Sequence, residues 1–195
     1  VTDDLSLARG APAKFDDMIA LGSRQLVRLG EGRFGIVGDK LTVQGEALSP
    51  EDHEALVADM ATADGFEAIA DVSAPVVRGP YVFRAEQDGG KLMLSGYAPG
   101  KDDRKRLAEM AGDGATDQVV IADGVPEGMN WTVAAAKAIE AAALLANGSA
   151  DISGRRLNIT GDARDLDAFR SLQELIGSPL PGGLVLGTTD IGLPE

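Results

Sequence analysis

Apolar and polar positions alternate in short stretches of this chain, and the same alternation returns three times. The stretches read GDKLTVQG (residues 38–45), GGKLMLSG (89–96) and GRRLNITG (154–161). Each has a glycine turn, an alternating strand and a closing glycine, a pattern typical of a β-hairpin. Leu56, Leu107 and Leu172 follow at one common distance, within a helical pattern. The repeat therefore predicts a hairpin followed by a helix, a unit too small to bury its own apolar face.

The first copy predicts a complete set of elements. In order these are a helix (15–29), two strands (34–36 and 41–45), a helix (50–63) and a closing strand (67–72). Gly30 and Gly32 are expected to end the first helix. Ser49, Pro50 and Glu51 favour the start of the second helix, because they supply a capping hydroxyl, a fixed φ and an acid for the first turn.

The other copies follow the same order with one omission. The second predicts a hairpin (81–97), a helix (101–112) and a strand (118–122), and the third a helix (131–146), strands near residues 150 and 157, a helix (165–176) and a strand (184–186). Only residues 73–80 stand where the first helix of the second copy should be. We therefore expect an α/β (α+β) protein of tandem αββαβ repeats, with mixed sheets covered by helices on one face.

These repeats divide the chain into four parts. They are the closing strand of a preceding module (1–12), module 1 (13–75), module 2 without its first helix (76–123) and module 3 (124–195). The first part rests on Leu5 and Leu7, which match the strand that ends module 2. The chain is therefore interpreted as a piece of a longer protein.

Charge limits the classes of partner. The net charge of −13 repels phosphate backbones and anionic headgroups, so nucleic acid is not expected as a partner. The chain nevertheless has one local basic patch, formed by Lys101, Arg104, Lys105 and Arg106, that could attract anionic groups. The most apolar segment, residues 133–146, is shorter than the ~20 residues of a membrane span, so a buried helix is expected there.

A glycine-rich segment suggests an enzyme as an alternative. LGEGRFGIV (residues 29–37) resembles the phosphate-covering loop of protein kinases, which would make residues 30–35 a nucleotide site. A kinase also needs a catalytic histidine-arginine-aspartate loop, and the one histidine here is His53, between two acids. We therefore interpret Gly30, Gly32 and Gly35 as a junction between helix and strand, with a nucleotide-binding enzyme as the remote alternative.

The other reactive side chains favour structural roles. His53 has no partner nucleophile and is expected on the solvated face of a helix. Trp131 heads an apolar helix and is expected in the core. Acidic pairs occur at Asp3 and Asp4, Asp16 and Asp17, Glu51 and Asp52, Asp102 and Asp103, and Asp165 and Asp167. Most lie in first turns of predicted helices, where the helix dipole favours them. No catalytic, cofactor-binding or metal-binding residue is predicted, and the chain has no cysteine.

The repeated segments resemble BON-type modules, in particular the degenerate tandem copies that precede the peptidoglycan-binding domain of alphaproteobacterial OmpA-family proteins. The resemblance rests on LMLSGYAP (92–99), on PYVFRAE (80–86), on the Gly-x-Pro turns at Gly10 and Gly124, and on the closing glycines Gly45, Gly96 and Gly161. It extends over nearly the whole chain, but nothing after Ile176 resembles the OmpA domain itself.

The resemblance implies a non-enzymatic binding or spacer module in the periplasm, associated with the outer membrane. The expected partners are envelope components: phospholipid, an envelope protein, or peptidoglycan through a domain outside this sequence. A stand-alone periplasmic protein of the osmotic-stress type is the alternative within the same family. The resemblance defines no binding residue, and no cofactor is implied.

Overall fold

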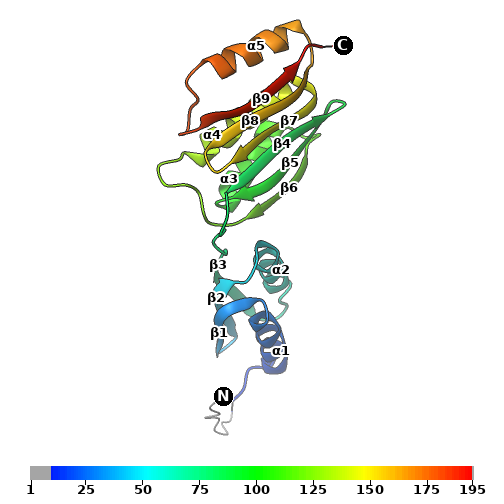
Figure 1. Cartoon of the computed structure of the whole chain (residues 1–195). Helices are drawn as coiled ribbons and strands as arrows, with labels where there is room; N and C mark the ends of the chain where they lie inside the picture. The colour runs from blue at the N-terminus through cyan, green and yellow to red at the C-terminus, as the bar shows by residue number, and fades with distance from the viewer. Residues whose placement is uncertain (1–9, 195) are drawn as a thin grey trace. The chain divides into compact units, whose positions relative to one another are not determined.

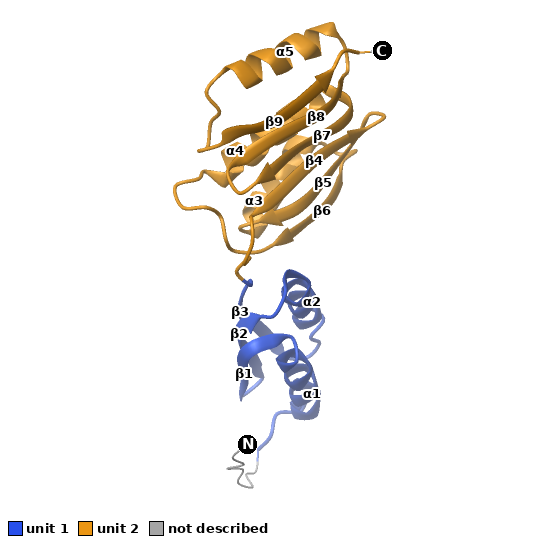
Figure 2. Ribbon diagram, viewed as in Figure 1, with its two compact units in different colours: residues 1–75 blue, residues 76–195 orange. Residues whose placement is uncertain are grey.

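The protein is an α+β structure with mixed sheets, as the repeats predict. The computed structural model describes residues 10–194, which contain five helices and nine strands. They fall into two compact units, unit 1 up to Pro75 and unit 2 from Val76 onward, coloured separately in Figure 2. The strand expected around Leu5 and Leu7 lies outside the described residues.

Unit 1 contains one repeat with all of its elements. They are α1 (Phe15–Leu26), β1 (Leu29–Val37), β2 (Lys40–Ala47), α2 (Pro50–Ala61) and β3 (Glu67–Ser73). The strand order is β1-β2-β3, with an antiparallel hairpin and a parallel third strand. Both helices pack on the sheet around a core that includes Met18, Leu41, Val43, Leu56 and Met60.

Unit 2 joins two repeats in one sheet. Its elements are β4 (Val82–Asp88), β5 (Lys91–Ala98), α3 (Lys101–Ala111), β6 (Thr116–Ile121), α4 (Trp131–Ala143), β7 (Leu145–Ser153), β8 (Arg156–Ala163), α5 (Leu166–Gly177) and β9 (Val185–Gly192). The strand order is β6-β5-β4-β7-β8-β9 (Figure 1), so the first strands of modules 2 and 3 pair, and they do so antiparallel. The sequence left this pairing between copies open.

One face of the six-stranded sheet carries the core of unit 2. Strand residues such as Phe83 and Ile159 pack there against side chains of α3, α4 and α5 in a single cluster. The opposite face carries charged pairs, including an ion pair between Arg84 and Asp151 at 3.4 Å. Alternation along the strands therefore separates an apolar inner face from a polar outer face. No helix within residues 10–194 is long and apolar enough to cross a bilayer.

The leucines that define the repeat occupy matching positions. Leu41, Leu92 and Leu157 are each the second residue of β2, β5 or β8. Leu41 and Leu157 are fully buried, and Leu92 is partly buried against the same core as Leu157. All three face inward, which confirms the prediction that these segments are structurally equivalent.

The closing glycines are required where two hairpin strands approach closely. Gly45, Gly96 and Gly161 have φ of 151°, 99° and 133°, a region that L side chains rarely adopt. A Cβ added at Gly45 or Gly96 would lie 2.4 Å from a carbonyl oxygen of the opposite strand, and one at Gly161 would be closer still. The closing glycine of each repeat is thus fixed by backbone contact.

The predicted end of the first helix was wrong. α1 ends at Leu26, and Gly30, Gly32 and Gly35 lie within β1. Leu29 fits the helical spacing, but it is the first residue of β1 and its side chain is buried there. A β-bulge between Leu29 and Gly32 shifts the register of β1 against β2. The corresponding bulge in β7 shortens α4 in the same way, and β9 is longer than the strand predicted at residues 184–186.

We predict that Gly161→Ala lowers the free energy of unfolding of unit 2 by more than about 2 kcal/mol, because the new methyl group meets the backbone of β7 at an unfavourable φ. Urea unfolding followed by the fluorescence of the buried Trp131 measures this change. Gly177→Ala is the control, since a Cβ there meets nothing within 4 Å and φ is not positive. Equal effects of the two substitutions would contradict the assignment.

Candidate binding site

The kinase-like segment does not form a loop. Gly32, Arg33 and Gly35 lie in β1, each opposite a residue of β2 in the hairpin. A Cβ on Gly32 would overlap the side chain of Leu29, so this glycine serves the bulge. The backbone of these glycines is engaged in a sheet, and its arrangement differs from the phosphate-covering loop that the sequence suggested.

His53 is buried, contrary to the expectation of a solvated residue. Its side chain is 8% exposed, and its Nε2 lies 3.3 Å from the carbonyl oxygen of Val72. The flanking acids suggested a polar face, but Leu56 and Met60 follow at helical spacing and place His53 on the inner face of α2. The Nδ1 atom has no hydrogen-bond partner among the described residues.

Trp131 lies in the core, as predicted. Its ring makes edge contacts with Tyr81 and Phe83, at centroid distances of 6.3 and 5.6 Å. Tyr81 donates a hydrogen bond to the carbonyl oxygen of Ala122, and burial raises the pKa of its phenol. This aromatic group joins α4 of module 3 to β4 of module 2.

The acidic pairs within the described residues lie at helix N-termini, as predicted. Asp16, Asp17, Glu51, Asp52, Asp102, Asp103 and Asp167 occupy first turns. Asp165 caps α5, and the hydrogen bond from the Ala168 amide, followed by that from Arg164, lowers the pKa of its carboxyl group. Asp3 and Asp4 lie outside the described residues. No group of three potential ligands within residues 10–194 could hold a metal ion.

The basic patch on α3 is partly neutralised. Arg104 contacts Asp117 at 2.8 Å, and Lys105 lies 3.9 Å from Glu109. Lys101 and Arg106 remain exposed on the same helix. The patch therefore offers less positive charge than the sequence suggests.

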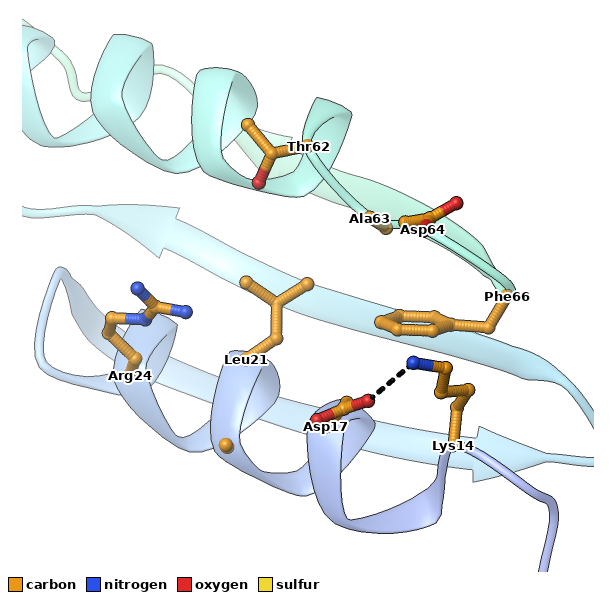
Figure 3. A pocket seen from close by; sticks show the side chains of 9 residues that line it. Lys14, Asp17, Leu21, Arg24, Thr62, Ala63, Asp64 and Phe66 are labelled. Atoms are coloured by element: carbon orange, nitrogen blue, oxygen red, sulfur yellow. Dashed lines mark ion pairs between the residues drawn. The ribbon is translucent and has the colours of Figure 1, made fainter.

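The candidate binding site is an open pocket in unit 1 of about 280 Å³ (Figure 3). It lies between α1 and the connection from α2 to β3, residues 62–66. Leu21 and Phe66 supply apolar surface, while Lys14 and Arg24 stand at its two ends along α1. The lining thus combines apolar surface with two cationic side chains.

Carboxylates partly balance the cations of this pocket. Lys14 forms an ion pair with Asp17 at 3.1 Å, drawn as a dashed line in Figure 3, and Asp64 lies on the opposite rim. The stem of Lys14 also lies beside Gly65, where an added Cβ would be 3.4 Å from its Cε. Lys14 is therefore placed by both sides of the pocket, and its ammonium group stays near the surface.

A partly buried polar network links the two helices near this pocket. Arg28 donates a hydrogen bond to the Asp59 carboxylate at 2.8 Å, and Gln25 donates another at 3.3 Å. Gln25 is fully buried on α1, whereas Asp59 belongs to α2. The bond from Arg28, and then that from Gln25, holds the pKa of Asp59 below its ordinary value.

The corresponding region of module 3 is built differently. Its connection from α5 to β9 covers residues 178–184, two more than in module 1. There the amide of Asn130 donates to the carbonyl oxygen of Gly182 at 2.9 Å, and a Cβ on Gly182 would lie 2.8 Å from the Asn130 oxygen. The longer connection thus packs directly on the first turn of α4, where module 1 has the Lys14 side chain.

Sequence reasoning did not identify this pocket. Lys14 and Phe66 are far apart in the sequence, and no motif links them. The one available signal was the shorter connection after the second helix of module 1, which became informative only once it was compared with module 3.

Comparisons with known proteins define no family for this chain. No family model matches the sequence, and no curated protein matches it. Among solved structures, CdsD, a structural protein of the Type III secretion system of Chlamydia trachomatis, is 17% identical over 92% of this chain and 93% of that chain, with a TM-score of 0.25. A TM-score this low does not indicate a shared fold, so no role is transferred from CdsD.

We predict that Asp59→Asn lowers the free energy of unfolding of unit 1 at pH 7 by about 1 kcal/mol, because a partly solvent-screened, charge-assisted contact between α1 and α2 is lost. Since the pKa of Asp59 is lowered in the folded protein, its contribution is complete above about pH 4 and disappears as the pH falls further. The difference between the variant and the parent protein should therefore vanish in acid.

The methyl resonances of the buried Met18 and Met60 report the unfolding of unit 1 in urea. Asp71→Asn is the control for loss of one negative charge, because Asp71 accepts its hydrogen bond from Gln44 on the exposed face. An Asp59→Asn effect that persists unchanged at pH 2.5 would show that packing, rather than the charge, explains it.

Proposed function

We propose that this chain is a non-enzymatic binding and spacer module of the bacterial envelope, located in the periplasm as part of an OmpA-family outer-membrane protein. Support comes from the BON-like segments at residues 80–86 and 92–99, which form β4, β5 and their connections. Support also comes from the structural roles of the glycines, the acidic pairs and Trp131, which account for the side chains that first suggested chemistry.

The observation that carries this proposal is the amphipathic pocket of unit 1. Its apolar lining and its two cations fit a ligand with a phosphate or carboxylate attached to an apolar group. Envelope phospholipids have that chemistry. The overall charge of −13 opposes approach to an anionic membrane, so the local cations must provide the attraction.

The proposed lipid contact predicts weak, salt-sensitive binding to phosphatidylglycerol vesicles. The chain should sediment with these vesicles at low ionic strength, and roughly tenfold less in 0.5 M salt, where exposed charges are screened within a few ångströms. Vesicles of phosphatidylcholine should retain less protein, because they carry no net charge.

Lys14→Ala/Arg24→Ala should reduce binding to phosphatidylglycerol vesicles by about thirtyfold, since each of the two basic residues contributes about 1 kcal/mol near an anionic surface. Lys101→Ala/Arg106→Ala removes the same charge from α3 in unit 2 and is the matched control. If the control variant loses binding and the pocket variant keeps it, the contact belongs to α3. If the parent protein sediments with no vesicle, the lipid proposal fails.

A further inference from the structure

The first strand of module 1 lacks the neighbour that its counterparts have. β4 and β7 are the first strands of modules 2 and 3, and they pair with each other in the centre of the sheet. β1 is the corresponding strand of module 1, and it forms an edge of its three-stranded sheet. The closing strand of every module, β3, β6 or β9, is an edge strand. Among the described first strands, β1 alone is also at an edge.

The pairing of β4 with β7 has two-fold symmetry. Ala85 lies opposite Ala150, and both residues correspond to Phe34 in the repeat. On either side, Phe83 lies opposite Ile152 and Gln87 opposite Gly148. Phe83 and Gly148 are equivalent to Gly32, and Ile152 and Gln87 are equivalent to Ile36. Each pair therefore joins the same two repeat positions. A strand of this repeat can therefore pair with a copy of itself in a single, symmetric register.

The outer edge of β1 is compatible with the same pairing. In an antiparallel hairpin, alternate residues direct their N–H and C=O groups away from the partner strand. Since Ala85 and Ala150 use these groups to pair β4 with β7, the equivalent groups of Phe34 point outward from β1. β1 has no proline, and the bulge near its start does not prevent pairing, because β7 has a bulge in the equivalent place.

Exposure along β1 agrees with a missing neighbour. Ala85 and Ala150 are fully buried, whereas Phe34 is only half-buried. Ile152 is also buried, and its equivalent Ile36 is half-buried. A strand added beside β1 would cover the apolar side chains that this edge leaves partly open to water.

α1 lies over its own hairpin, unlike its counterpart α4. In unit 2, α4 lies over both β7 and β4, whereas α1 lies over β1 and β2 of its own hairpin. The side chains between helix and strand also differ in size. In module 1 the large Phe34 packs against Gly22, whereas the equivalent residues of module 3 are Ala150 and Ala138. Among the described residues, α1 therefore does not extend beyond β1 as α4 extends from β7 over β4.

We propose that two copies of this chain associate through antiparallel pairing of β1 with β1, with Phe34 of one copy opposite Phe34 of the other. A second copy is the occupant that matches this edge, because it supplies the same strand, the same outward groups and the same register. Arg33 does not oppose this pairing, since its side chain bonds Gln44 at 2.9 Å within its own sheet. The interface is small, so the dimer is a weak one.

Gly35 gives a test in which charge changes the dimer in both directions. In the proposed register Gly35 lies opposite Arg33 of the second copy, as Asp151 lies opposite Arg84 in unit 2. A side chain at Gly35 meets nothing within 4 Å, and its φ is not positive, so substitutions there keep the fold. Gly35→Asp should tighten the dimer about tenfold and Gly35→Lys should weaken it about tenfold, as measured by sedimentation equilibrium.

The matched controls are Gly114→Asp and Gly114→Lys, which introduce the same charges at another glycine with free space. They should leave the dissociation constant unchanged. A protein that stays monomeric up to millimolar concentration in all variants overturns the proposal. So does a dimer whose affinity responds equally at Gly35 and Gly114, because that response would reflect net charge alone.

Cross-linking tests the register, since the chain has no cysteine of its own. Arg33→Cys protein mixed with Gly35→Cys protein should form a disulfide-linked dimer several-fold faster than either protein alone. Residues directly opposite fit the geometry of a disulfide, whereas diagonal pairs lie ~7–8 Å apart and do not. Equal rates in the mixture and in the separate proteins would contradict this register.

Discussion

The close approach of two strands at one glycine per repeat is the constraint on which each module depends. At Gly45, Gly96 and Gly161 the backbone of the opposite strand lies so close that it would overlap with a Cβ atom. That contact restricts the position to glycine and holds the two strands of the hairpin close together. The inward leucines then bury one face, so backbone geometry and hydrophobic packing select the same register.

Most elements could be predicted because the repeat supplies three views of one pattern. Ser49 and Pro50 marked the start of α2, and alternation located β2, β5 and β8. The end of α1 was misplaced, because Leu29 satisfies both a helical period and an inward strand position. His53 was misplaced because its acidic neighbours outweighed its spacing from Leu56. In both residues, tertiary packing decided between two local patterns that the sequence allowed.

The candidate site depends on features that no local pattern encodes. The pocket exists because the connection after α2 is short and because Lys14 fills the place that backbone occupies in module 3. The length of a loop can be counted in a sequence, but its effect on a cavity can be predicted only when the positions of both helices are known. The pairing of β4 with β7 is a contact of the same kind, since strand order between repeats leaves no mark on hydrophobic alternation.

The missing first helix of module 2 makes its folding dependent on module 3. α4 covers strands from both modules, and its Trp131 packs on Tyr81 and Phe83 of module 2. Module 2 on its own would expose this apolar surface, so we expect the two repeats of unit 2 to unfold together. In module 1, α1 covers its own hairpin. A cut after Pro75 would therefore fall between the two compact units, whereas a cut between modules 2 and 3 would divide a single core.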